Sequence, residues 1–507
     1  MGVWNGAGRM MASETTHSLS DSRTGIFPAR KRRSAPPLTR PSGKASEGIV
    51  TASVSRKRGR KDISLPDYLP QNPPFYVVFV AAFAALMLLG SLLLWLPQAR
   101  APSASTSFPD ALFTSASAVS CTGLVVADTG AHWSTFGQAV ILVLIQLGGF
   151  GFMLISSYLL IVLGERVRLL DFRFSDALDT YSRPACVRFA LQTIGLTVLF
   201  ECLGIILLYY RFGSVLPSGG GAWEAVFHSV SAFNNAGFNI LTGSDLGAFQ
   251  GDTFILLTIS ALVILGGLSA PVLISLFAAR GWKGLNLNSK VAIAFTVVFL
   301  VVGVLGIFAM EYGSEDSLGP LSVPAKIVNS IFCSVNARTA GFSALDIGTL
   351  GFQSLALLML LMFIGGVAGS TAGGIKVNSF AVLLLTVRSY ITGESRVHAF
   401  GKQIPEERVH EAITVFALSL MVVCIPVLIL AFSEDVAKLD LLFESVSAFG
   451  TVGLSTGITA SLSVAGRMVI AAAMFVGRLG PLTIVLAIAE RRRSSGISRP
   501  EESLRVW

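Results

Sequence analysis

The chain has 507 residues, of which 52% are hydrophobic and only 13% are charged, and its mean hydropathy is +0.69. A soluble domain carries roughly a quarter charged residues, so this composition excludes an ordinary soluble protein and indicates one that lies in lipid. A net charge of +8 would suggest nucleic-acid binding in a soluble chain. Here the basic residues gather in alternate loops between apolar runs, so we expect no nucleic-acid partner. The five cysteines show no paired spacing, which indicates neither a disulfide framework nor a metal site.

Residues 1–70 precede the first apolar run and are rich in serine, proline and arginine, with basic clusters at Arg30–Arg33 and Arg56–Lys61. An arginine- and serine-rich start with few acids could be an organelle transit peptide. No amphipathic helix is evident in it. We therefore interpret this segment as a disordered basic cytoplasmic tail that contacts anionic membrane lipid.

Eight apolar runs follow, most of them as long as the roughly 20 residues that cross a bilayer. They cover residues 76–96, 136–163, 189–210, 254–279, 291–309, 355–387, 413–432 and 468–489. Arginine and lysine are concentrated between runs two and three, four and five, six and seven, and after the last run, whereas the alternate loops carry mostly acids. The positive-inside rule then predicts a multi-pass membrane protein with both termini in the cytoplasm.

Between successive pairs of runs, four shorter segments repeat one pattern. Each has a phenylalanine, a serine two residues later, an alanine five later and a glycine after nine or ten. They are Phe113–Gly123, Phe227–Gly237, Phe332–Gly341 and Phe443–Gly453. A helix of about a dozen residues cannot cross a bilayer, so it must enter the membrane and return. We predict an all-α integral membrane fold with eight transmembrane helices in four M1–P–M2 repeats around a pseudo-fourfold pore with re-entrant pore helices.

The predicted repeats occupy residues 71–163, 164–280, 281–390 and 391–490, and a cytoplasmic C-terminal tail occupies 491–507. Non-helical backbone at membrane depth survives only inside protein or beside water, so the four turns should line a cavity. Glycine permits dihedrals that point carbonyls inward, where they replace the hydration shell of a cation, while the short helices aim their negative C-terminal ends at it. The alternative is that the glycines merely permit tight turns, which fits their fourfold recurrence less well.

These turns carry a family resemblance. Four loops resemble those of the Trk/Ktr/HKT superfamily of cation transporters, namely Cys121–Leu124, Asn235–Phe238, Thr339–Phe342 and Thr451–Leu454. Gly365–Lys376 resembles the superfamily's intramembrane loop, and Gly477–Thr483 resembles the arginine-bearing part of its last span. The resemblance covers about residues 72–490. With eight expected spans, the chain is more similar to the KtrB potassium-translocating subunit than to TrkH.

The resemblance implies potassium uptake across the bacterial inner (plasma) membrane through a channel-like pore, since glycine at all four turns goes with potassium in the superfamily. It implies K⁺ as the substrate, no covalently bound cofactor, a homodimer with one pore per subunit, and a cytosolic nucleotide-binding regulatory ring of the KtrA/TrkA type. The ion-selectivity filter, with K⁺ at its carbonyls, would consist of Cys121, Thr122, Gly123, Asn235, Ala236, Gly237, Thr339, Ala340, Gly341, Thr451, Val452 and Gly453.

A second repeated element follows each turn by 24 to 29 residues. Three copies read Gly-Gly, and the fourth puts Arg478 in place of the second glycine, which predicts a charge near the pore axis below the filter. After the third copy, glycines among small polar residues cannot form a stable helix, which predicts a flexible plug. Lys376 is either an anchor of this plug or the interfacial end of the span. The predicted gate comprises Gly369, Ser370, Thr371, Gly373, Gly374, Lys376 and Arg478.

Other polar residues leave alternatives open. Glu201 could pair with Lys376 or Arg478, bind a coupling ion, or be protonated or solvated. His228 is expected to be a local hydrogen-bonding group, and Asn234 and Asn235 to brace their loop.

Two other functions compete with a channel-like pore. Gly369-Ser370 faintly resembles a nucleophile turn, but no span carries a histidine base at that depth, so we expect no enzyme. A sodium- or proton-coupled potassium symporter is the alternative function. Parallel fourfold repeats favour a channel-like route over the twofold inverted repeats of many symporters. The symport alternative would include Na⁺ dependence.

Overall fold

The computed structural model describes residues 75–168, 183–216, 221–241, 246–279 and 281–480. Both expected tails, 1–70 and 491–507, lie outside these residues, as does the C-terminal part of the eighth apolar run. The regular structure of the described chain is helical apart from one antiparallel hairpin of two short strands, β1 (His398–Ala399) and β2 (Lys402–Gln403). The expectation of an all-helical fold is therefore right except for this hairpin.

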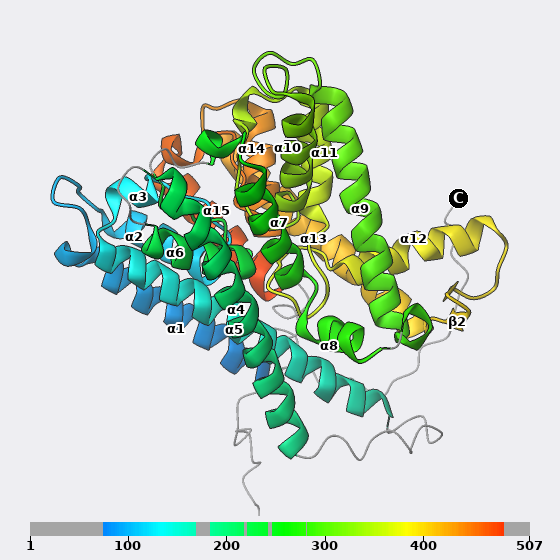
Figure 1. Cartoon of the computed structure of the whole chain (residues 1–507). Coiled ribbons are helices and arrows are strands. Elements are labelled where there is room, and N and C mark those ends of the chain that lie inside the picture. Colours follow the sequence, from blue (N-terminus) through cyan, green and yellow to red (C-terminus); the bar gives the residue numbers. More distant parts are fainter. Residues whose placement is uncertain (1–74, 169–182, 217–220, 242–245, 280, 481–507) are drawn as a thin grey trace, which may run out of the picture. The chain divides into compact units, whose positions relative to one another are not determined.

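Four described helices are long and apolar enough to cross a membrane (Figure 1). They are α1 (Phe75–Trp95), α5 (Arg183–Val215), α9 (Leu287–Glu311) and α13 (Glu406–Ser433). Each is followed by a shorter helix whose second half is buried, namely α2 (Phe108–Val119), α6 (Ala222–Phe233), α10 (Val323–Asn336) and α14 (Lys438–Gly450). A further apolar helix follows each of these: α4 (Thr135–Arg168), α7 (Thr253–Gly267), α11 (Phe352–Phe363) and α15 (Val464–Leu479). The order long helix, short helix, apolar helix thus occurs four times.

Smaller elements connect these helices. They are α3 (Thr129–His132), α8 (Ala270–Ala278), α12 (Val377–Ile391) and the 3₁₀ turns η1 (Pro97–Ala99), η3 (Gly247–Phe249), η4 (Trp282–Gly284), η5 (Ile347–Thr349) and η6 (Thr459–Ser461).

Two of the expected spans are broken. The run 355–387 divides into α11 and α12 around a non-helical loop at residues 364–376, as its glycines predicted. The run 254–279 was expected to be one span, but α7 and α8 meet at an angle of 96°, and α8 leaves α7 sharply in Figure 1. Ser269 has a left-handed φ of +64° and Pro271 stands in the first turn of α8. Both features stop a continuous helix.

The repeated serine joins each short helix to the long helix before it. The serine hydroxyls donate to backbone carbonyls: Ser115 to that of Met87 at 2.7 Å, Ser229 to that of Glu201 at 2.7 Å and Ser334 to that of Leu300 at 2.9 Å. Three residues after each acceptor stands a glycine, at 90, 204 and 303, and a Cβ at any of them would lie within 3.0 Å of the serine hydroxyl. In the fourth copy, Ser445 donates to Leu441 of its own helix instead. Three of the four crossings therefore require a glycine on the long helix.

We expect Gly204→Ala to destabilise the folded protein by about 1–3 kcal/mol, because the new methyl group would displace the Ser229 hydroxyl and the Leu262 side chain. Gly195→Ala on the same helix is the matched control, since a Cβ there meets nothing within 4 Å. Thermal unfolding of the purified protein in detergent measures both. Equal unfolding midpoints for the two variants would contradict this account of the crossing.

Candidate functional site

The four glycine turns share one backbone conformation. In each turn, two residues with left-handed φ flank one residue: Cys121 (52°) and Gly123 (90°), Asn235 (54°) and Gly237 (69°), Thr339 (75°) and Gly341 (76°), Thr451 (48°) and Gly453 (94°). Non-glycine residues seldom adopt positive φ. Four recurrences at matching positions therefore indicate a conformation that the surrounding structure imposes.

The N–H group between these two residues points back to the short helix. Each of these amides donates to the carbonyl that stands four residues after the repeated phenylalanine. The bonds run from Thr122 to Ser117 at 2.8 Å, Ala236 to Ser231 at 2.8 Å, Ala340 to Asn336 at 3.0 Å and Val452 to Ser447 at 2.9 Å. By contrast, no hydrogen bond within the described residues uses a carbonyl of the twelve predicted filter residues. The turns therefore present a set of carbonyl oxygens without protein donors.

The turns close into a ring. A Cβ added to Gly123 would collide with the Ala236 carbonyl, one on Gly237 with the Ala340 carbonyl, one on Gly341 with the Val452 carbonyl, and one on Gly453 with the Thr122 carbonyl, each within 3.0 Å. Each turn thus touches the next, and the fourth touches the first. The structure brings all twelve predicted filter residues together.

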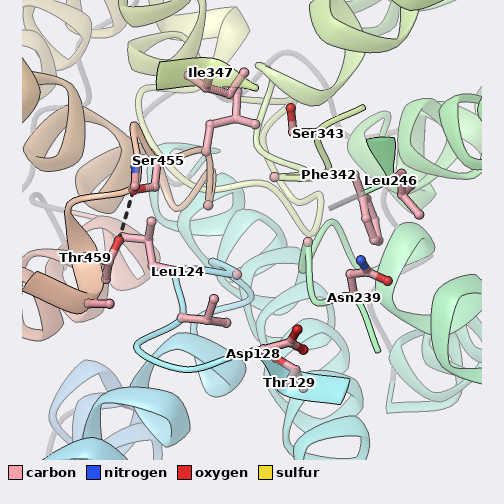
Figure 2. A pocket seen from close by; sticks show the side chains of 18 of the residues that line it. Leu124, Asp128, Thr129, Asn239, Leu246, Phe342, Ser343, Ile347, Ser455 and Thr459 are labelled. Carbon is pink, nitrogen blue, oxygen red and sulfur yellow. Dashed lines mark hydrogen bonds between the residues drawn. The ribbon is translucent and has the colours of Figure 1, made fainter. Parts of the chain in front are cut away.

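A cavity of about 330 Å³ opens on one side of this ring, lined by its four glycines and by the segments that follow them. Its polar lining includes Asp128, Asp346, Asn239, Ser455 and Thr459. Figure 2 shows Ser455 and Thr459, which are hydrogen-bonded at 3.0 Å, on one side of the cavity, with Asp128 and Asn239 elsewhere around it. Carboxylates and hydroxyls at this mouth would attract a cation.

On another side of the ring lies the loop at residues 364–376, the predicted plug. Its base is tied by hydrogen bonds from Gly365 N to Ile375 O at 2.9 Å and from Val377 N to Gly366 O at 3.0 Å. The side chains of Ser370 and Thr371 are 0% and 1% exposed. The loop is therefore a folded and buried segment.

This loop contacts the other repeats. Arg478 of α15 donates through Nη1 to the Thr371 carbonyl and through Nη2 to the Gly148 carbonyl at 3.1 Å and the Cys121 sulfur at 3.3 Å. The Thr371 hydroxyl lies 3.2 Å from the side-chain amide of Asn235. The predicted gate residues on the loop and on α15 are therefore in direct contact.

The end of the loop is anchored as well. Lys376 donates through Nζ to the Ala372 carbonyl. This bond within the loop favours the interpretation of Lys376 as an anchor over that of an interfacial span end.

The second repeated glycine element has a packing role in three copies. A Cβ on Gly148, Gly266 or Gly477 would lie within 3.0 Å of the carbonyl of Val119, Phe233 or Phe449, respectively, at the end of the short helix in the same repeat. In the third copy, Gly365 faces the carbonyl of Gly373 within the loop instead. In these three repeats the glycine thus reflects the close approach of two helices beneath the turn.

The remaining predicted polar residues form local networks. Glu201 accepts from Gln146 Nε2 at 3.3 Å and from Asn234 Nδ2 at 3.0 Å. Asn234 thereby braces its turn, as predicted. The His228 ring nitrogens lie 2.7 Å from the Glu224 carbonyl and 2.7 Å from Asn239 Oδ1, so the prediction of a local hydrogen-bonding histidine is confirmed.

Sequence analysis missed two buried charged side chains in the short segments. Glu444, which is 0% exposed, accepts from the Thr459 hydroxyl at the mouth. Arg338, which is 7% exposed, donates at 3.2 Å to the carbonyls of Thr296 and Gly365. Both could have been found by aligning the four repeats, since the corresponding positions in the other copies carry uncharged residues or a histidine.

Apolar helices of membrane-spanning length around a closed ring of carbonyls define a multi-pass integral membrane protein for transport. The TrkH family of cation transport proteins matches residues 58–497, and the chain belongs to this family. The resemblance seen in the loop sequences is thus confirmed. The family consists of transporters, so the likeness of Gly369-Ser370 to a nucleophile turn carries no enzymatic function.

Individual relatives agree. The chain is 35% identical over 419 residues to the Ktr system potassium uptake protein B of Bacillus subtilis, covering 82% of this chain and 94% of that protein. It is 33% identical to the potassium/sodium uptake protein NtpJ of Enterococcus hirae, covering 89% and 99%. Its fold matches the crystal structure of the potassium transporter TrkH from Vibrio parahaemolyticus with a TM-score of 0.67 at 19% identity, over 84% of this chain and 86% of that one.

Proposed function

We propose that the chain takes up potassium ions through a single pore whose selectivity filter is the ring of four glycine turns. The observation that carries this proposal is the set of turn carbonyls that have no donor among the described residues, while the middle amide of each turn is bonded to its short helix. Such carbonyls replace the hydration shell of a cation. The name of the Bacillus relative, a potassium uptake protein, supports K⁺ as that cation.

In this proposal the chain has eight membrane-spanning segments in four M1–P–M2 repeats with the boundaries 71–163, 164–280, 281–390 and 391–490. The short helices are the re-entrant pore helices, and their C-terminal ends face the ring with the negative end of the helix dipole. The basic loops lie on the cytoplasmic side together with both termini. The membrane is the bacterial inner membrane.

The gate consists of the loop at residues 364–376 together with Arg478. Their direct contact supports this assignment, since Arg478 donates to the Thr371 carbonyl. A fixed positive charge beside the pathway raises the energy of a passing cation. At an effective dielectric of about 20 and a separation of roughly 6 Å, two unit charges repel by about 3 kcal/mol. A barrier of that height slows passage about a hundredfold.

Gly123→Ser should raise sodium relative to potassium permeability, because its Cβ would displace the Ala236 carbonyl in a turn that has a φ of +90°. Reversal potentials in proteoliposomes measure the permeability ratio. Gly251→Ser is the control, since a Cβ there meets nothing within 4 Å. An unchanged ratio in a normally folded Gly123→Ser protein would count against a filter at this turn.

Arg478→Ala should increase potassium flux, by up to about a hundredfold if the repulsion acts fully as a barrier. Shortening residues 369–374 should act in the same direction. Selectivity should change little, because Arg478 contacts the first turn through the Cys121 side chain rather than through a turn carbonyl. Arg211→Ala is the control, because Arg211 is partly exposed near the C-terminal end of α5. There it pairs at 2.7 Å with Asp252, the residue before α7. Flux at the wild-type level in both gate variants, with the protein folded and inserted, would contradict the proposed gate.

A sodium- or proton-coupled symport is the second candidate function. The Enterococcus relative, which is 33% identical to this chain, is named a potassium/sodium uptake protein, and this name supports symport as a candidate. Reversal potentials with potassium, sodium and pH varied separately distinguish the two functions. A potential that follows the potassium gradient alone indicates a channel-like pore, whereas a shift with the sodium or proton gradient indicates coupling.

We further propose that the chain forms a homodimer and docks a cytosolic nucleotide-binding ring of the KtrA/TrkA type on its basic inner loops. The name of the Bacillus relative, a component of a Ktr system, supports a partner subunit. Crosslinks from the ring protein to the purified dimer should fall on the loops rich in arginine and lysine. Crosslinks to the acidic loops instead would show that both the topology and the docking face are wrong.

A further inference from the structure

Arg338 is a buried cation next to the third turn. It takes part in none of the ion pairs formed by the described residues. Its guanidinium donates instead to two backbone carbonyls at 3.2 Å each, Thr296 of α9 through Nη1 and Gly365 at the base of the intramembrane loop through Nη2. Burying an arginine without a counter-charge is unfavourable, so its retention here points to a role.

The position of Arg338 breaks the fourfold pattern. Counting back three residues from each turn glycine gives Ser120, Asn234, Arg338 and Gly450. Ser120 bonds to Ala116 of its own helix at 2.6 Å, and Asn234 bonds to Gln146 and Glu201. Of these four residues, Arg338 is the one whose side chain is hydrogen-bonded to the intramembrane loop. The third turn therefore has a direct connection to the loop.

The loop is held by cationic side chains at its base and near its tip. Arg338 holds the Gly365 carbonyl, whereas Arg478 holds the Thr371 carbonyl. The N–H of the same Gly365 closes the base of the loop by donating to Ile375. Thr339, the residue after Arg338, has its Cγ2 atom 3.4 Å from a Cβ placed on Gly365. A displacement of the loop base would therefore be transmitted to the third turn.

We propose that Arg338 is a positioning residue that couples the intramembrane loop to the third turn of the filter. Opening the loop breaks the Arg338–Gly365 bond or draws Arg338 and Thr339 along with Gly365. A cavity of about 20 Å³, lined by Arg338, Thr296 and Gly366 among others, lies beside the side chain. The inference rests on the proposed gate and adds that the filter and the gate do not act independently.

The test compares Arg338→Met with Arg478→Ala in proteoliposomes, measuring potassium flux and the sodium-to-potassium permeability ratio. Arg338→Met keeps the apolar stem but loses the donors, so flux should rise about tenfold, as expected for one lost charge-assisted hydrogen bond. It should also shift the permeability ratio, and by more than Arg478→Ala does, because Arg338 stands next to the third turn whereas Arg478 holds the loop from α15. Arg338→Lys should restore part of both effects. Arg211→Met is the control, because Arg211 pairs with Asp252 away from the loop.

A wild-type flux and ratio in folded Arg338→Met, with Arg478→Ala still raising flux, would overturn the coupling and leave the gate intact. Wild-type flux in both variants would remove the gate as well. Should Arg338→Met not fold, Arg338→Lys decides through thiol labelling at Ser370→Cys, corrected for the native cysteines. Ser370 is 0% exposed. Faster labelling of the Arg338→Lys, Ser370→Cys double variant than of Ser370→Cys alone supports the proposed role of Arg338. An equal rate overturns it.

Discussion

Backbone polar groups in lipid need hydrogen-bond partners. This fold is organised around the carbonyl groups of the four glycine turns, which have no donor among the described residues. The turn carbonyls at the ring can persist because the middle amide of each turn is bonded to its short helix and the four turns enclose one another. The short helices in turn are buried among the longer ones. The serine and glycine crossings of α1 with α2, α5 with α6 and α9 with α10 allow this close approach. The packing of the long helices thus serves to hold twelve residues of irregular backbone.

Fourfold symmetry holds for the backbone of the ring but not for what lies beneath it. All four turns have the same pair of positive φ angles. Below them, the third repeat supplies the buried loop, the fourth supplies Arg478, and the second supplies a side-chain amide to Thr371. In the proposed pathway, a cation would meet equivalent oxygens in the ring and a single asymmetric obstruction after it. Selectivity and control would then reside in different residues that are joined through Arg338.

The sequence predicts features that are local or repeated, such as the four turns, the short helices and the non-helical stretch at 364–376. Repetition compensates for the weakness of each single motif, because four copies with matching spacing exclude a chance pattern. It even places Arg478 near the loop, since the other copies carry glycine there. The break at Ser269 was not predicted, because the run 254–279 reads as continuous and a left-handed φ at one serine is imposed by its surroundings. The partners of Glu201 and Arg338 were not predicted either, since they come from helices far away in the sequence.

The break between α7 and α8 has a consequence for how the chain is made. Where α7 ends, the Gly267 carbonyl accepts a hydrogen bond at 3.1 Å from the Val367 amide of the intramembrane loop. That donor lies a hundred residues later in the chain. During synthesis the second repeat enters the bilayer before its partner has left the ribosome, and a carbonyl at membrane depth must then be hydrated or held by other groups. The second repeat is therefore an incomplete unit until the third has inserted beside it. We expect the second repeat to reach its final packing only after the third has inserted and its loop supplies the missing donor.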